Sequence, residues 1–229
     1  TGELTTASGR QSFSGGYDST ASGDASFAVG GGTTASAENA FAACGTTVAS
    51  GISSAAFGAF SEATATNSFA TGGNTRANGE SSFSGGVSST AHGLGSVALG
   101  LSCNSYQPGS FSGGTVSSAL QFSMAWGDNA NATAISSQAF GYITTAAASY
   151  SMAAGFNNST GGNASAVFGQ QNNFDTNSHK SFGSGFLNTL KASESVVFGS
   201  YNGFTWNTST TPSNQFMLGK YLNVPRAGS

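Results

Sequence analysis

A motif of the form Ser-Phe-Ala-Val-Gly, at residues 26–30, returns in variant forms along almost the whole chain. Its closing glycines recur with a nearly constant spacing as far as Gly199, and only the last step, to Gly219, is much longer. A period of about 14 residues, sustained this long, indicates a repeat protein in which each unit stacks on its neighbours. The closing glycines are Gly2, Gly16, Gly30, Gly45, Gly58, Gly72, Gly86, Gly100, Gly114, Gly127, Gly141, Gly155, Gly169, Gly185, Gly199 and Gly219.

The composition excludes several classes of protein. Of the 229 residues, only 7% are charged while 11% are aromatic, which is not the signature of a disordered chain. Glycine does not recur every third residue, so the chain is not collagen. No apolar run of about 18 residues occurs, so we expect no membrane insertion by this segment. The six Lys and Arg residues are scattered along the chain and give no basic patch of the kind that binds nucleic acid. Because the chain starts within a repeat and shows no signal peptide, we expect a fragment of a longer protein.

Each unit divides into two halves of about seven residues, and each half predicts a short strand followed by a tight corner. Within the Ser-Phe-Ala-Val-Gly half, strand alternation turns the residue two before the glycine away from its bulky neighbours. This position carries small residues, so we expect it to fill a narrow interior, with glycine supplying the positive φ of the corner. The interior column comprises Ala28, Ala56, Ala70, Ala98, Ala125, Ala139 and Ala153.

The bulky residue three before each closing glycine points the other way, and a lumen of alanine size is too thin to hold it. A stripe of large apolar side chains would then face water on a single chain, beyond what soluble monomers usually expose. We therefore predict a homotrimer whose protomers pack this column around a three-fold axis. The trimer-packing column comprises Phe13, Phe27, Phe69, Phe83, Val97, Phe111, Met124 and Met152.

The regularity of the repeat predicts the domain organisation. Residues 1–169 hold regular 14-residue units, residues 170–219 hold degenerate units with a longer loop near 203–212, and residues 220–229 form an exit segment or tail. Cys44 and Cys103 are about four units apart, or roughly 20 Å at a ~4.8 Å strand spacing. That separation is too large for a disulfide within one chain.

Residues 89–93 (Ser-Thr-Ala-His-Gly) followed by residues 96–100 (Ser-Val-Ala-Leu-Gly) resemble the head repeats of YadA-type trimeric autotransporter adhesins. The same repeats occur in phage fibres and in some large-virus surface proteins. The resemblance covers residues 2–199 and implies an all-β, left-handed parallel β-roll that assembles as a trimer. Phe and Met replace most of the usual Val and Ile, and no heptad stalk follows. Residues 199–202 and 216–221 resemble the closing repeats of phage-type fibres, which favours a virion fibre over a bacterial cell-surface adhesin.

We predict no catalytic residue, metal site or cofactor. Nine carboxylates are spread along the chain, and Asp18 with Asp24, which fall in one unit and share a face in this interpretation, are expected to be solvated turn residues. His92 and His179 are about six units apart, too far to share a metal ion. Exposed aromatic residues stack on sugars or anchor protein contacts. The candidate surface contacts are Tyr201, Phe204 and Trp206.

Three functions are compatible with this pattern. The first is a structural attachment module outside the cell, on a virion or alternatively on a bacterium, that binds a host cell-surface protein or glycan by many weak contacts. The second is a flat array that binds ice or polysaccharide, since Thr6, Thr20 and Thr34 recur with the period before Val48 and Arg76 interrupt the column. The third is a glycan-cleaving enzyme, for which a thin roll offers no groove.

Overall fold

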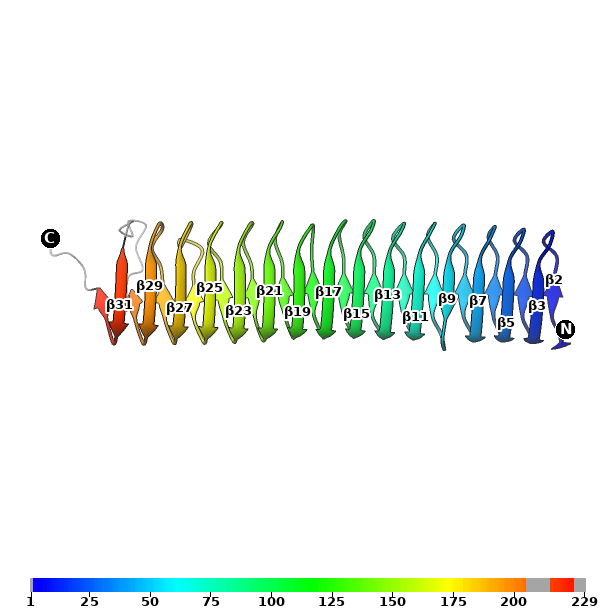
Figure 1. The fold of residues 1–229 in the computed structure, drawn as a ribbon, viewed down its shortest axis with the longest axis horizontal. Coiled ribbons are helices and arrows are strands. Elements are labelled where there is room, and N and C mark those ends of the chain that lie inside the picture. Colours follow the sequence, from blue (N-terminus) through cyan, green and yellow to red (C-terminus); the bar gives the residue numbers. More distant parts are fainter. Residues whose placement is uncertain (1, 205–214, 225–229) are drawn as a thin grey trace. The chain divides into compact units, whose positions relative to one another are not determined.

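The computed structural model describes residues 2–204 and 215–224, except for the side chains of 204, 223 and 224. The described residues form strands and turns in two compact units, Thr1–Val116 (unit 1) and Ser117–Ser229 (unit 2). Each unit is a parallel β-solenoid in which one long and one short strand alternate, as Figure 1 shows. Within the described part of the chain, no helix is long and apolar enough to span a membrane.

In unit 1 the long strands pair in parallel in one sheet and the short strands in a second. The long strands are β1 (Gly2–Glu3), β3 (Phe13–Tyr17), β5 (Phe27–Gly31), β7 (Phe41–Gly45), β9 (Ala55–Phe57), β11 (Phe69–Gly73), β13 (Phe83–Val87), β15 (Val97–Leu101) and β17 (Phe111–Thr115). The short strands are β2 (Thr6–Ala7), β4 (Thr20–Ala21), β6 (Thr34–Ala35), β8 (Val48–Ala49), β10 (Glu62–Ala63), β12 (Arg76–Ala77), β14 (Thr90–Ala91) and β16 (Asn104–Ser105).

Unit 2 has the same two-sheet arrangement. Its long strands are β19 (Met124–Asp128), β21 (Gln138–Tyr142), β23 (Met152–Phe156), β25 (Ala166–Gln170), β27 (Phe182–Phe186), β29 (Val196–Ser200) and β31 (Phe216–Lys220). Its short strands are β18 (Ser118–Ala119), β20 (Asn131–Ala132), β22 (Thr145–Ala146), β24 (Ser159–Thr160), β26 (Asn173–Phe174), β28 (Thr189–Leu190), β30 (Gly203–Phe204) and β32 (Asn223–Val224). The predicted change of character at residue 169 falls inside unit 2, and most of the predicted loop and tail lies outside the described residues.

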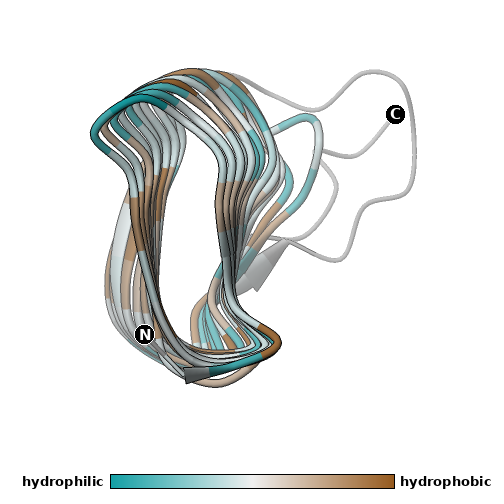
Figure 2. Ribbon diagram, turned by 90° about the vertical axis from the view of Figure 1, so that its right-hand side faces the viewer, coloured by the Kyte–Doolittle hydropathy of each residue, from teal (hydrophilic) through white to brown (hydrophobic). Residues whose placement is uncertain are grey.

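Each coil is a flattened loop with two walls and two corners, which Figure 2 shows end-on. The long-to-short corner leads from a long strand to the following short strand, and the short-to-long corner closes the coil. Strand register joins equivalent positions of successive units, as in Phe13 with Phe27, so each coil adds one strand to each wall. This register confirms the 14-residue β-solenoid that the sequence predicts.

The two walls meet through small side chains. Ala28 and Ala70 from long strands and Ala21 and Ala63 from short strands are all fully buried. The other predicted interior residues, Ala56, Ala98, Ala125, Ala139 and Ala153, are also fully buried.

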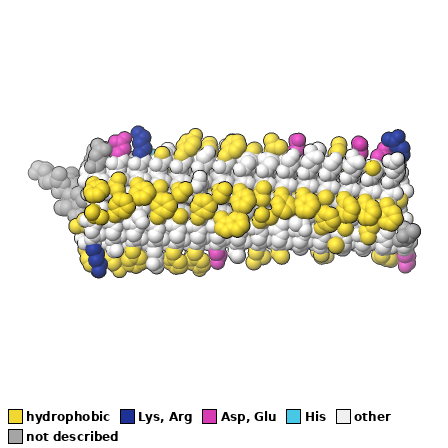
Figure 3. Space-filling view, viewed as in Figure 1, with side chains coloured by type: hydrophobic (Ala, Val, Ile, Leu, Met, Phe, Trp, Pro, Cys, Tyr) yellow, Lys and Arg dark blue, Asp and Glu magenta, His cyan; other side chains and the backbone are white. Residues whose placement is uncertain are grey.

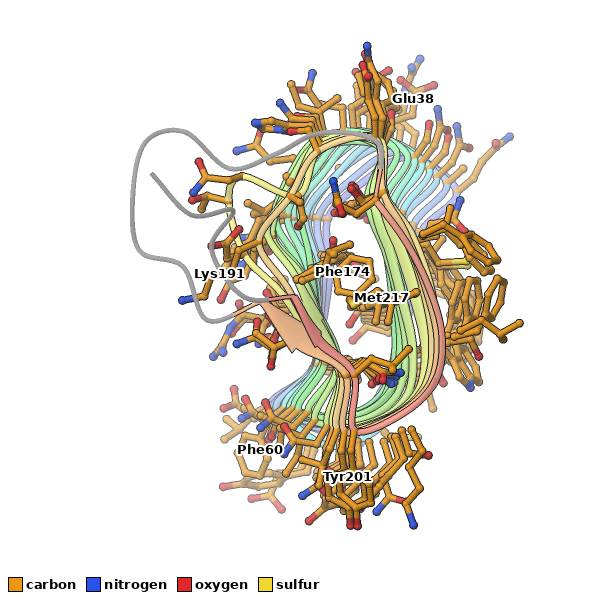
Figure 4. The ribbon with its side chains drawn as sticks, turned by 90° about the vertical axis from the view of Figure 1, so that its left-hand side faces the viewer. Glu38, Phe60, Phe174, Lys191, Tyr201 and Met217 are labelled. Carbon is orange, nitrogen blue, oxygen red and sulfur yellow. The ribbon has the colours of Figure 1, made fainter. Side chains whose placement is uncertain are left out.

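The prediction that only Ala-sized residues fit the interior is wrong near the C-terminus. Phe174 and Leu190 are buried from the short-strand wall and Val197 from the long-strand wall, and Figure 4 shows Phe174 and Met217 inside the coil. Space for the Phe174 ring comes from Gly183 on the opposite wall, where an added Cβ would lie 2.3 Å from Phe174 Cζ. The lumen therefore admits a ring in this coil because the facing residue has no side chain.

Most of the closing glycines have positive φ, as predicted, but they lie within the long strands, and the left-handed residue of each corner is a different one. That residue is glycine in some coils, such as Gly32 (φ 67°), and another residue in most, such as Asp18 (φ 51°) at the long-to-short corner and Ala25 (φ 54°) at the short-to-long corner. The closing glycines have a second reason besides φ. Gly16 has φ 109°, and an added Cβ would lie 2.2 Å from the carbonyl oxygen of Gly30, so close approach of neighbouring coils requires glycine there.

A buried column follows each long-to-short corner and hydrogen-bonds the next coil. In unit 1 it carries Ser and Thr except for Cys103, and Ser19 Oγ donates to the Gly30 carbonyl at 2.7 Å. In the later coils of unit 2 it carries Asn158, Asn172, Asn188 and Asn202, which we call the asparagine ladder. Asn172 Nδ2 donates to Asn158 Oδ1 at 3.0 Å, and Asn188 Nδ2 donates to Asn172 Oδ1 at 2.9 Å.

Candidate interaction surfaces

The long strands present a hydrophobic outer face in each unit. In Phe27–Gly31, the side chain of Ala28 is buried while those of Phe27 and Val29 on either side are partly exposed. The same alternation holds along the other long strands because strand side chains alternate in direction. We call the outward first and third residues of the long strands the ring face; it forms the hydrophobic band in Figure 3.

The two columns of the ring face compensate each other in size. Where the third residue is glycine, as at Gly85, the first is Phe83, and where the first is Ala55 the third is Phe57. The outward space above Gly85 is filled by its neighbours, since an added Cβ would lie 3.0 Å from Leu99 Cδ2 and 3.6 Å from Phe83 Cζ. Most coils therefore contribute at least one large apolar side chain to the face.

The rings of this face stack from coil to coil. In unit 1 the centroids of Phe27 and Phe41 are 4.7 Å apart, and the stack then passes to Phe57 of the other column at 5.1 Å and returns to Phe69 at 5.6 Å. In unit 2, Phe182 lies 5.6 Å from Phe168 and 5.5 Å from Phe198. The contribution of Phe57 was not predicted, because only the first of the two columns was followed in the sequence; the third position of the motif carries the signal.

The structure places the whole predicted trimer-packing column on the ring face. Phe13, Phe69 and Met124 are 44%, 37% and 41% exposed, so none of the three is sheltered within its own chain. Phe27, Phe83, Val97, Phe111 and Met152 are half-buried by their neighbours. Packing around a three-fold axis stays a prediction.

A second apolar surface lies at the long-to-short corner of unit 2, where Figure 4 shows Tyr201 pointing outward. Tyr142 and Phe156 stack at 5.2 Å, Phe186 packs edge-on against Tyr201 at 5.2 Å, and Tyr201 stacks on Tyr221 at 4.9 Å. The Lys220 ammonium lies 4.8 Å from the Tyr221 centroid. We call these exposed and half-exposed residues the aromatic edge: Tyr142, Ile143, Phe156, Phe186, Leu187, Tyr201 and Tyr221.

Of the three predicted surface contacts, only Tyr201 has a described side chain, and it is 42% exposed. Phe204 lies in β30 and Trp206 lies outside the described residues.

The ionisable side chains do not converge on a site. Asp18 lies at the long-to-short corner with Phe60, whereas Asp24 lies at the short-to-long corner with Glu38; Figure 4 shows these corners at opposite ends of the coil. The idea that the two carboxylates share a face is therefore wrong. Asp24 accepts from Arg10 Nε at 2.9 Å and Nη2 at 2.6 Å, and these bonds lower the pKa of Asp24.

The histidines serve local contacts. His92 stacks on Tyr106 with centroids 5.5 Å apart, and His179 Nδ1 accepts a hydrogen bond from the Asn163 amide at 3.1 Å. Among the described residues, no three His, Cys, Asp or Glu side chains come together as a metal site. Cys44 is exposed, Cys103 is buried, and they form no disulfide.

No protein-family model matches this chain, and no curated protein does. What the chain can do therefore has to be argued from its surfaces. These comprise the ring face, the aromatic edge and the polar outer face of the short strands, where Thr6, Thr20 and Thr34 lie in register.

Proposed function

We propose that this chain is a non-enzymatic attachment module, assembled as a homotrimer through its ring face, that holds a host surface from a virion fibre. The observation that carries the proposal is the hydrophobic ring face, along which the coils of each unit line up large apolar side chains. Eight coils of unit 1 at ~4.8 Å, by a width of about 10 Å, present about 400 Å². A contiguous apolar patch of this size is as large as the largest patch on an ordinary soluble monomer, and such patches often serve interactions.

The left-handed coil and the three-fold assembly are the finer part of this proposal and follow from the resemblance to adhesin head repeats. Self-association through the ring face is favoured because the face is apolar and uncharged, and a second copy offers the same surface. The module then lies outside the cell. The alternative location is the head of a bacterial trimeric adhesin, which presents the same surfaces to the same class of partner.

Light scattering coupled to size exclusion tests the assembly. We expect three times the 22.6 kDa mass of one chain. Phe57→Lys places a charge on the ring face and should yield monomers or aggregates, because a desolvated ammonium without a partner opposes association. Phe60→Lys is the matched control, since Phe60 is 61% exposed at a corner and its variant should stay trimeric. A stable monomer for the unaltered chain would remove the proposal.

Attachment itself is tested with the fluorescently labelled trimer and the Phe57→Lys variant on intact candidate host cells. The trimer should bind at least tenfold more tightly, since linked sites convert weak contacts into avidity. Equal binding of trimer and monomer would argue against an attachment role that depends on repetition.

A flat ice- or polysaccharide-binding array is the second candidate, favoured by the register of Thr6, Thr20 and Thr34 with exposed Ser22 and Ser36 beside them. The same column then carries Glu62 and Arg76, whose side chains pair at 3.2 Å. Because this ion pair interrupts the array, we expect no thermal hysteresis in a freezing assay of the purified protein.

A further inference from the structure

We propose that the aromatic edge of unit 2 contains a slot for one neutral sugar ring of a glycan chain, between Phe156 and Phe186 at the level of Gln170. The inference rests on the proposed attachment function and names the ligand class and the residues that would hold it. The slot lies in the column formed by the last residues of the long strands β21, β23, β25 and β27. The residues on either side of it therefore belong to paired strands.

The slot is a gap in a ladder of rings. Strand register places Tyr142, Phe156, Gln170 and Phe186 in one column on successive coils. Tyr142 stacks on Phe156 with the ring planes 12° apart, so the opposite face of Phe156 is turned toward the coil of Gln170. Two coil spacings of ~4.8 Å separate the Phe156 and Phe186 positions by about 9.6 Å.

A gap of this width accommodates one inserted ring when the Gln170 side chain, which stands in the same column, turns aside to bind it. Rings on successive coils of this protein stack with centroids 4.7 to 5.6 Å apart, which is about half of the gap. A pyranose ring centred in the gap would pack its apolar C–H face on the Phe156 ring. Its opposite face would lie at a similar distance from Phe186. Phe186 is held in place by its edge-on contact with Tyr201 at 5.2 Å.

The floor and rim of the slot carry uncharged hydrogen-bonding groups. Gln170 and Asn157 are exposed and Gln171 is half-buried, so three side-chain amides offer both donors and acceptors for sugar hydroxyls. No Asp, Glu, Lys, Arg or His occurs between Asp128 and Asp175. Aromatic faces with amides and no charge select a neutral ligand over a sialylated or sulfated one.

The backbone of the edge is rigid, because corner amides bond the preceding coil. The amide of Asn157 donates to Tyr142, that of Gln171 to Phe156 and that of Leu187 to Gln170, at 2.8, 2.8 and 3.0 Å. The walls are thus in place before a ligand arrives, which lowers the entropic cost of binding.

The test is binding of the purified, intact protein to printed neutral oligosaccharides of glucose, galactose, mannose and N-acetylglucosamine, with sialylated and sulfated glycans as charged comparisons. We expect binding to a neutral glycan. Gln170→Phe adds the missing ring and fills the slot, so it should weaken that binding at least tenfold while the thermal midpoint stays the same or rises. Phe156→Ala should also weaken it.

Tyr17→Ala is the matched control. Tyr17 is a 56% exposed aromatic in the equivalent column of unit 1, where its neighbour in register is Gly31, so its variant should bind normally. Unchanged binding by Gln170→Phe, binding only to charged glycans, or no glycan binding by a protein that attaches to cells would each overturn the inference. If light scattering shows a monomer and the protein attaches to no cells, the proposed function itself is wrong. If the protein is a trimer that attaches to cells but binds no glycan, only the present inference is wrong.

Discussion

At the residue scale, Cys44 occupies a position that the other coils reserve for glycine. Register pairs Gly30 with Cys44, not with Gly45 as the sequence spacing implied, so the repeat of unit 1 continues through this coil without a slip. Cys44 has φ 91°, and the next long strand, β9, is shortened to Ala55–Phe57. A side chain at this point strains the backbone and interrupts strand pairing.

Cys44→Gly should therefore stabilise the protein by about 1 kcal/mol, because relief of the left-handed strain outweighs the added freedom of the unfolded chain. Urea unfolding with a constant m-value checks this. Cys44→Ala keeps the Cβ and should give no gain. An equal gain in both variants would show that loss of the thiol, and not backbone relief, was responsible.

The Arg10–Asp24 pair makes stability depend on pH. The side-chain hydrogen bond from Arg10, followed by the bond from its backbone N–H, lowers the pKa of Asp24 below its unfolded value. Its contribution is therefore present above the unfolded pKa and is lost as pH falls through the folded pKa. The effect is small because both side chains are exposed.

We expect Asp24→Asn to be slightly less stable than the unaltered protein at pH 7 and equally stable below about pH 2. Denaturant melts at both pH values measure the difference. A deficit that persists in acid would mean that the carboxylate charge is not its source.

At the element scale, irregular coils keep their strands and change a corner. The short-to-long corner between Leu120 and Ser123 is shorter than in the regular coils. The corner around Asn177 is longer, so that Gly169 pairs with Gly185 across a wider step in the sequence. The strands stay in register in both coils because the change falls in a corner, outside the paired strands.

The enlarged interior of unit 2 depends on one pairing of sizes. Gly183→Ala would set a methyl group against the Phe174 ring and Val197 Cγ1, at 2.3 and 2.7 Å, and should cost about 2 kcal/mol. Phe174→Ala alone should cost about 3 kcal/mol by leaving a cavity. In the Phe174→Ala background the contact with the ring is gone and only the Val197 contact remains, so we expect Gly183→Ala to cost less there than it does alone. Strict additivity in thermal melts would contradict this coupling.

The asparagine ladder joins coils through buried side chains. Asn172 donates to Asn158 Oδ1 and to the carbonyls of Phe168 and Gly185, at 2.9 to 3.0 Å. Asn172→Ala should destabilise the protein by about 3 kcal/mol, because several buried partners lose their bond. Asn173→Ala, at an exposed neighbouring position, should change stability by less than about 0.5 kcal/mol. Similar losses of stability in both variants would show that the hydrogen bonds of the asparagine ladder do not stabilise the protein.

At the scale of the whole molecule, a solenoid is stabilised by contacts between successive coils, so stability varies along it. We predict slower amide hydrogen exchange for residues 159–202 than for residues 6–105, because the ladder and the larger apolar interior add to the backbone pairing there. Mass spectrometry of exchanged peptides measures this. Faster exchange in 159–202 would show that these additions do not raise local stability.

The period, the parallel register and the alanine interior were readable from the sequence because each depends on a residue type recurring at a fixed interval. The step of the ring stack from Phe41 in one column to Phe57 in the other was not predicted. It depends on which of the two columns carries the large residue in each coil. The left-handed residue of each corner was not predicted, because it is mostly not glycine and belongs to no constant residue type.

The repeat alone was enough to predict 14-residue coils of short parallel strands, because small residues at a fixed spacing allow successive units to stack and pair their backbones. How the coils contact one another could be seen only in the folded chain. The ring path over Phe57, the Phe174–Gly183 fit, the asparagine ladder and the gap at Gln170 all arise between residues of different coils or opposite walls, and their sizes and hydrogen bonds match only once the coils are stacked.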